Sequence, residues 1–128
     1  MPIRWLTIFL DFPAGDFGPG AAFWRDMTGS TLSSFRGQAA EFATLLPPAG
    51  DACLRVQRIA GGPGGCHLDL HVDTATESLH RAAEGAVGLG ASVRHQDGDL
   101  IIADSPGGFT FCLVPWDGET AVPGPARL

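Results

Sequence analysis

The segment from Cys66 to Asp73, C-H-L-D-L-H-V-D, most constrains the fold, because its polar and apolar residues alternate without interruption. A period of two residues indicates a β-strand with one buried face and one polar face. We expect the two leucines and the valine to pack under a helix. The opposite face carries two imidazoles and two carboxylates, and we expect it to line a cavity or to face solvent.

The same alternation occurs near the start of the chain, in Trp5 to Asp11, W-L-T-I-F-L-D. This segment aligns without a gap with His67 to Asp73, 62 residues later, so that Leu6, Ile8 and Leu10 are also expected under a helix. The period is longer than that of a solenoid and predicts two copies of one module. We place the modules at about residues 3–60 and 66–116 of a single domain, with a tail at 117–128.

Each module is predicted to contain a strand, a helix and three further strands. In the first module, a strand over Ile3 to Asp11 is followed by a glycine- and proline-rich stretch, Phe12 to Gly20, which predicts a loop. A short helix is expected over Ala21 to Thr28, ended by Gly29. Its expected apolar stripe consists of Phe23, Trp24 and Met27.

In the second module, the helix is predicted over Thr74 to Leu89, because apolar residues recur there at helical spacing. Asp73 or Thr74 is expected to cap it, with Glu77 completing a capping box. The dipeptide Asp97-Gly98 predicts a hairpin turn between the next two strands.

Charge and cysteine content narrow the classes of partner and compartment. Fourteen acidic against eight basic residues give a net charge of −6, which argues against nucleic acid as the main partner. No apolar run approaches the roughly 20 residues that span a bilayer, and the opening M-P-I-R-W-L does not resemble a signal peptide. Three cysteines without paired spacing indicate free thiols in a reducing cytoplasm.

Several motifs then carry a resemblance to a known superfamily. They are F-W-R-D-M-T-G-S-T-L-S, E-F-A-T-L-L-P-P, L-R-V-Q-R-I, H-L-D-L-H-V-D, L-G-A and D-S-P-G-G-F-T-F-C-L-V-P. Over about residues 3–116 the chain resembles the glyoxalase/bleomycin resistance protein/dioxygenase superfamily, also called vicinal oxygen chelate, and within it the glyoxalase-like subgroup. The resemblance implies an α+β fold in which two tandem βαβββ modules form a curled mixed sheet, shaped as a cup. It also implies a homodimer.

The resemblance further implies metal ligands on the first and last strands of each module. Carried over, these positions fall at Trp5, His67 and Thr110, with the fourth near Arg55 or Gln57. Of these, His67 alone supplies a ligand typical of the family, and a lone imidazole is a poor site for a divalent ion. We therefore expect no metal or other cofactor.

Asp69 is the residue most able to rebuild a metal site, because it shares a strand face with His67. If a divalent metal binds, these two residues are its expected ligands. The more conservative interpretations are that Asp69 and His71 form a structural pair, and that Cys112 is a small apolar filler rather than a nucleophile.

These observations lead to a functional prediction with two alternatives. We expect a protein that binds a small, partly aromatic molecule in a metal-free cup. The expected lining is Trp5, Thr7, Phe9, Arg55, Gln57, His67, Asp69, His71 and Thr110. The first alternative is an enzyme, a lyase or dioxygenase of the same superfamily that uses His67 and Asp69 with a metal, or His67 as a general base. The second is an interaction subunit with no ligand.

Overall fold

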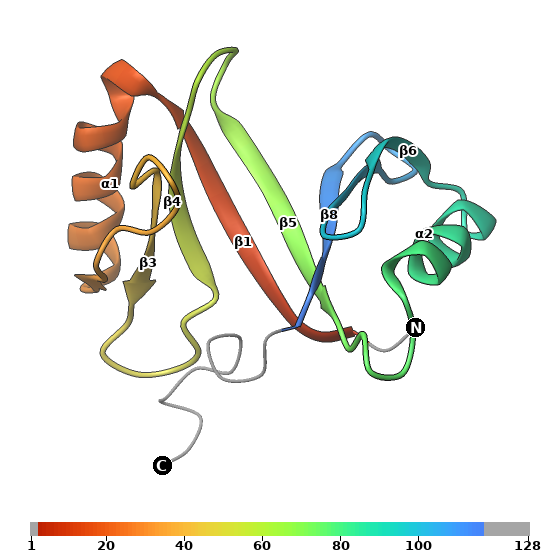
Figure 1. The fold of residues 1–128 in the computed structure, drawn as a ribbon. Helices are drawn as coiled ribbons and strands as arrows, with labels where there is room; N and C mark the ends of the chain where they lie inside the picture. The colour runs from red at the N-terminus through yellow and green to blue at the C-terminus, as the bar shows by residue number, and fades with distance from the viewer. Residues whose placement is uncertain (1–2, 117–128) are drawn as a thin grey trace. The chain divides into compact units, whose positions relative to one another are not determined.

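The computed structural model describes residues 3–116, which form eight strands and two helices (Figure 1). In chain order these are β1 (Ile3–Pro13), α1 (Ala14–Thr28), β2 (Thr31–Leu32), β3 (Phe42–Leu46), β4 (Leu54–Ile59), β5 (Gly65–Val72), α2 (Leu79–Gly88), β6 (Ser92–Gln96), β7 (Ile101–Asp104) and β8 (Thr110–Pro115). The predicted tail at 117–128 lies outside the described residues. The order confirms the predicted α+β class and the repeated βαβββ module.

The described residues divide into two compact units. The first unit contains residues 8–66, and the second contains residues 3–7 and 67–116. The hydrogen-bonded strand order is β2-β3-β4-β1-β5-β8-β7-β6. Strand β1 is divided between the units: its residues 3–7 belong to the second unit, and its residues 8–13 belong to the first. The predicted modules at about residues 3–60 and 66–116, and the single domain that contains them, stay predictions.

In the first unit, β1 runs parallel to β4, and β3 pairs antiparallel with both β4 and β2. Figure 1 shows α1 lying beside these strands. Phe17 and Ala21 of the helix pack on Ala43, Leu45 and Val56 of the sheet. Burying these side chains removes apolar surface from water, which is the main favourable contribution to folding of the unit.

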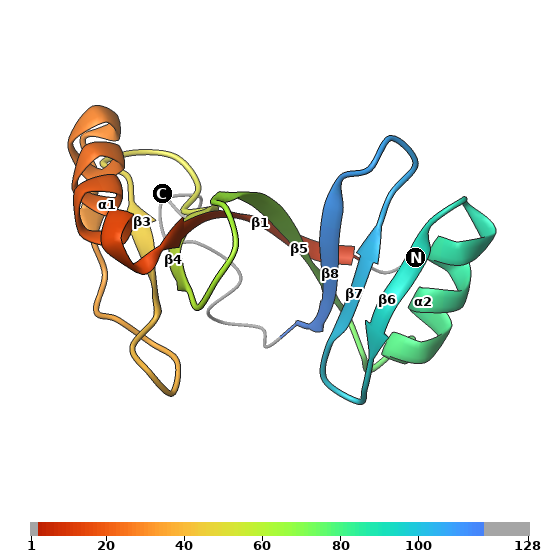
Figure 2. The ribbon, with the colours of Figure 1, turned by 90° about the horizontal axis from the view of Figure 1, so that it is seen from above.

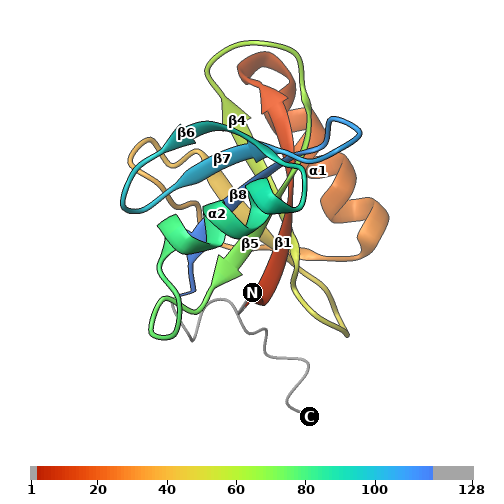
Figure 3. The same cartoon turned by 90° about the vertical axis from the view of Figure 1, so that its right-hand side faces the viewer.

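In the second unit, β8 lies between β5 and β7, parallel to the first and antiparallel to the second, and β6 is the outer strand (Figure 2). Helix α2 lies across one side of these strands in Figure 3. Its residues Leu79, Ala82 and Ala83 form a buried cluster with Val72 and Leu113. Leu70 packs against this cluster too, so the expectation that the apolar side of Cys66 to Asp73 faces a helix is confirmed for Leu70 and Val72.

The predicted burial is wrong at one strand position. Leu6, expected under a helix by alignment with Leu68, is 39% exposed. Leu10, in contrast, packs against the core of the first unit. Leu6 lies in the stretch of β1 that belongs to the second unit.

The first helix begins seven residues earlier than predicted, because the loop expected over Phe12 to Gly20 becomes helical from Ala14 onward. Phe17 explains the difference: it is 8% exposed and contacts the rings of Phe12 and Phe35 edge to face. Tertiary packing of this ring outweighs the low helix propensity of the glycines and of Pro19. Gly29 ends the helix in the left-handed conformation, with φ of 66°, as expected.

The apolar stripe predicted for that helix is wrong as well. The predicted members Phe23, Trp24 and Met27 are 57%, 36% and 72% exposed, respectively. The helix rotates so that Phe17 and Ala21, one turn apart, face the sheet instead. The earlier start of the helix explains which side faces the sheet, because it brings Phe17, a buried residue outside the predicted helix, into α1.

The second helix begins later than predicted, at Leu79 rather than Thr74. Ser78 caps it, and its hydroxyl oxygen accepts a hydrogen bond from the Arg81 backbone N–H. Asp73 serves a turn before the helix instead, since its carboxylate accepts from the Ala75 backbone N–H. No helix in residues 3–116 is long and apolar enough to cross a membrane.

Candidate functional site

The polar face of the second unit is the sheet side opposite α2. It carries Thr7, His67, Asp69, His71, Thr110 and Cys112. The parallel register of β5 and β8 places Asp69 directly opposite Cys112. Residues two apart on a strand share a face, so His67 and Thr110 join them. Five of the nine residues predicted to line the site lie on this face.

His67 and Asp69 form a close pair on this face. The imidazole Nε2 lies 3.4 Å from the Asp69 Oδ1, and the two side chains are only 16% and 14% exposed. The Asp69 Oδ1 is buried and makes no hydrogen bond to a residue in the described part of the chain. A buried carboxylate oxygen without a hydrogen-bond donor is uncommon in folded proteins, because it loses its hydration without replacement.

Cys112 lies beside this pair. One donor atom from each of His67, Asp69 and Cys112 lies within 4.8 Å of the other two. Cys112 is 8% exposed, so the expectation of a buried small side chain is confirmed. Its thiol nevertheless lies close to His67 and Asp69. The interpretation of Cys112 as an apolar filler did not predict this position.

His71 has a partner on the neighbouring strand. Its Nε2 lies 3.1 Å from the Thr7 hydroxyl oxygen, and the two residues are 6% and 0% exposed. Either atom donates, depending on the imidazole tautomer. The predicted pairing of Asp69 with His71 is therefore replaced by two pairs, His67 with Asp69 and His71 with Thr7.

A further group on the same face was missed by sequence reasoning. The Arg94 Nε donates to the Asp104 Oδ2 at 2.7 Å, and Nη2 donates to the Asp104 Oδ1 at 3.1 Å and to the Thr110 hydroxyl at 3.0 Å. The Thr110 hydroxyl in turn donates to the Asp104 Oδ1 at 3.0 Å. The Arg94 guanidinium, followed by the Thr110 hydroxyl, lowers the pKa of the Asp104 carboxyl below its ordinary value.

Three of the predicted site residues belong to the first unit. Phe9 is 5% exposed and pairs in register with Arg55, whose guanidinium carbon lies 5.6 Å from the centre of the ring. Gln57 pairs in register with Asp11. The structure thus brings Phe9 and Arg55 together. Trp5 is partly buried on β1 in the second unit. That all nine residues line one cup stays a prediction.

The metal positions implied by the superfamily resemblance do not fit a divalent ion here. Trp5 has no lone pair to offer, because the indole nitrogen acts only as a donor. The Thr110 hydroxyl is already engaged, accepting from Arg94 and donating to Asp104. The alternative donor set is His67, Asp69 and Cys112, whose nitrogen, oxygen and sulfur atoms are ligand types that zinc accepts.

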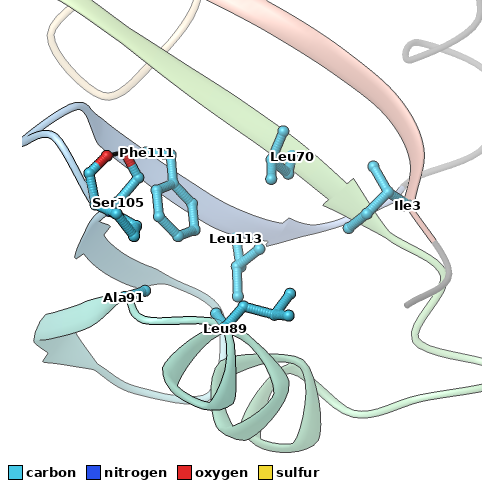
Figure 4. Close-up of a pocket in the computed structure, with 9 residues that line it drawn as sticks. Ile3, Leu70, Leu89, Ala91, Ser105, Phe111 and Leu113 are labelled. Carbon is cyan, nitrogen blue, oxygen red and sulfur yellow. Dashed lines mark hydrogen bonds between the residues drawn. The ribbon is translucent and has the colours of Figure 1, made fainter.

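An apolar hollow lies on the other side of the same sheet, with a volume of about 240 Å³ (Figure 4). Its lining includes Ile3, Leu70, Phe111 and Leu113 from the sheet, and Leu89 and Ala91 from the segment after α2. None of the residues predicted to bind a ligand lines it. Leu70 is consequently only partly buried, although its strand neighbour Val72 is fully enclosed.

Comparison with known proteins identifies the family. The model of the family described as "Glyoxalase-like domain" matches residues 7–114. A solved structure of a glyoxalase/bleomycin resistance protein/dioxygenase superfamily member from Vibrio splendidus 12B01 is 16% identical, with a TM-score of 0.53 over 86% of this chain and 98% of that chain. Methylmalonyl-CoA epimerase from Mycobacterium tuberculosis is 14% identical, with a TM-score of 0.50 over 93% of this chain and 92% of that chain. A search of curated proteins gave no match.

At these identities the solved structures show the fold alone. The family model, however, extends over most of the chain and includes β5, β8 and the polar face between them. The fold and the family match agree with the repeated βαβββ order found in the sequence. The chain therefore belongs to the glyoxalase-like domain family.

Proposed function

We propose that this protein binds a small, partly aromatic molecule on the polar face of the second unit, without a metal ion. The observation that carries the proposal is the Asp69 Oδ1, which is buried next to His67 and makes no hydrogen bond to a described residue. A ligand N–H or O–H group would supply the missing donor. A few polar groups placed among apolar ones are typical of small-molecule sites.

The neighbouring side chains support a binding role. His67 presents an imidazole held close to a carboxylate, and Thr110 and Cys112 lie on the next strand of the same face. Trp5 is the aromatic side chain of β1 expected to contact the ring of the ligand. The pair formed by His71 and Thr7 is buried, and its role in the proposal is to hold the face rigid.

A second candidate is a metal-dependent lyase or dioxygenase, and Cys112 is the observation that favours it. With this thiol, three donor atoms of different residues lie within 4.8 Å of one another. Three protein ligands with an open fourth position are typical of catalytic zinc sites. In this candidate, His67, Asp69 and Cys112 hold the ion, which would polarise a bound substrate.

Two measurements separate the candidates. Elemental analysis of tag-free protein, followed by titration with Zn, Ni, Mn and Fe salts, tests for a metal. Our proposal predicts much less than one metal ion per chain, because Asp69 and His67 serve a ligand instead. About one ion per chain, lost in His67→Ala and in Cys112→Ser, would establish the second candidate and contradict the first.

The binding proposal is tested by thermal shift against a panel of small aromatic compounds and 2-oxo acids, since a ligand that binds the folded state raises its melting temperature. We expect Asp69→Leu and His67→Ala to abolish the shifts produced by compounds that bind the unaltered protein. The matched control is Asp99→Leu, a change of the same type at an exposed position. Shifts that survive in Asp69→Leu would show that the ligand binds elsewhere.

Assembly and compartment are part of the same proposal. Resemblance to the superfamily supports a homodimer. All three cysteines are free thiols, which supports a reducing compartment such as the cytoplasm. A thiol titration of protein purified under anaerobic conditions should find three reactive groups after denaturation.

A further inference from the structure

We propose that the ligand of the polar face is a small aromatic carboxylate, and that Arg94 binds its carboxylate group. The inference rests on the proposed function, because it assigns the ligand class of that same site. It depends on where the guanidinium lies, on how it is held, and on which of its donors remain for a ligand.

Arg94 lies at a β-bulge and faces the polar side of the sheet. The pairing of β6 with β7 shifts between Val93 and His95, so Arg94 is the extra residue. Val93 packs against the core cluster on the α2 side, and His95 pairs with Ile102, which pairs in turn with Cys112. Bulges of this kind re-aim side chains and are frequent beside functional sites.

The hydrogen bonds of Arg94 hold its guanidinium in one orientation. The Asp104 carboxylate accepts hydrogen bonds from Nε and Nη2 in a bidentate contact, and the Thr110 hydroxyl oxygen accepts a second hydrogen bond from Nη2. An arginine held by three such bonds loses little further side-chain freedom when a ligand binds. Thr110 and Asp104 are therefore positioning residues for Arg94.

The remaining donors of Arg94 are available to a ligand. Nη1 carries two N–H groups, and neither makes a hydrogen bond to a residue within 3–116. The side chain is 54% exposed, so a molecule arriving from solvent can reach it. Guanidinium N–H groups bind carboxylates by short, charge-assisted hydrogen bonds.

The position of Arg94 also sets the size of the ligand. Thr110, which contacts Arg94, lies on β8 two residues before Cys112, and Cys112 pairs with Asp69 of the neighbouring strand β5. Neighbouring strands are about 4.8 Å apart. A ligand that reaches from Arg94 to Asp69 therefore spans on the order of 5–10 Å, which suits one aromatic ring. A carboxylate at one end would meet Arg94, and a hydroxyl or amino group at the other would donate to the Asp69 Oδ1.

Matched pairs of compounds test this inference. The probes are 3- and 4-hydroxybenzoate and the corresponding hydroxynaphthoates, each compared with its carboxamide, which has nearly the same shape but no charge. Binding is measured by titration calorimetry on the full chain at pH 7. We expect the unaltered protein to bind each carboxylate about tenfold more tightly than its amide, as for a hydrogen bond to a charged group.

The variant Arg94→Gln should reduce this preference to about twofold or less while changing the affinity for the amides by less than about twofold. The control is Arg81→Gln, which removes an exposed arginine from α2 and should keep the full preference. Arg94→Lys keeps the charge and should retain part of it. Circular dichroism of each variant reports its fold, and the preference for carboxylate over amide does not depend on overall stability.

The possible outcomes distinguish a failure of the carboxylate inference from a failure of the proposed ligand binding. Equal affinities of the unaltered protein for carboxylate and amide overturn the inference and leave the binding proposal standing. A preference that persists in Arg94→Gln also overturns it, because the anion is then bound elsewhere. Binding of no compound in either series contradicts the proposed function, and the inference falls with it.

Discussion

The buried contact of Thr7 with His71 allows a sharp test, because Thr7→Val removes a hydroxyl and keeps the branched shape. The contact is 3.1 Å long, and the residues are 0% and 6% exposed. Loss of a typical buried hydrogen bond costs about 0.5–1.5 kcal/mol. We therefore expect Thr7→Val to lower the free energy of unfolding by about 1 kcal/mol.

The assay is urea unfolding at pH 7, followed by circular dichroism, on the two single variants Thr7→Val and His71→Leu and on the double variant. The free-energy costs of the single variants should sum to more than that of the double variant, by a coupling energy of about 1 kcal/mol. Thr31→Val, a matched change at an exposed position, should cost less than about 0.5 kcal/mol. Additive costs within about 0.3 kcal/mol would refute the argument that the two side chains stabilise each other.

Three further predictions concern the core, the charges and the assembly. Leu113→Ala should destabilise the protein by about 2–5 kcal/mol, because Leu113 is 1% exposed, whereas Leu89→Ala, at a position 78% exposed, should cost less than about 0.5 kcal/mol in the same urea assay. The pKa of Asp104, followed by NMR, should lie below the ordinary value of about 3.9, and Thr110→Val should raise it. Because the folded-state pKa of Asp104 is lowered, its contacts with Arg94 and Thr110 stabilise the protein above the unfolded-state pKa. This stabilisation is lost as pH falls through the folded-state pKa. Light scattering should find a dimer, and a monomer at micromolar concentration would contradict that expectation.

The two faces of β5 could be predicted from the sequence because side-chain direction along a strand alternates by geometry alone. Leu70 and Val72 face α2, and Asp69 and His71 face the opposite side, as the pattern indicated. The repeated module was predictable for the same reason, since Trp5 to Asp11 carries the same alternation. Local periodicity carries such information without reference to the rest of the chain.

The first helix shows where local information was insufficient. Glycine and proline between Ala14 and Gly20 favour a loop by intrinsic propensity. The residues that reverse this preference are Ala43, Leu45 and Val56, which receive Phe17 but lie more than 25 residues away in the chain. A prediction made from neighbouring residues alone has no access to that contact.

The composition of the candidate site depended on strand register in the same way. Cys112 lies opposite Asp69 because β5 and β8 pair in parallel with one particular alignment. A shift of one residue would turn the Cys112 side chain away from Asp69. The sequence supplied His67 and Asp69 as neighbours on one strand, but the third member of the group came from a pairing between distant segments.

The position of Arg94 also depends on pairing between strands. Strict alternation from Val93, which faces the α2 side, would place Arg94 on the polar face and return His95 to the α2 side. The bulge instead leaves both Arg94 and His95 on the polar face, where the Arg94 guanidinium hydrogen-bonds Asp104 and Thr110. Nothing in the local pattern of the sequence marks the extra residue. A bulge interrupts the regular ladder of backbone hydrogen bonds, and bulges are frequent next to functional sites. Here the bulge turns His95 to the polar face beside Arg94, and the carboxylate preference described above measures what Arg94 contributes to binding.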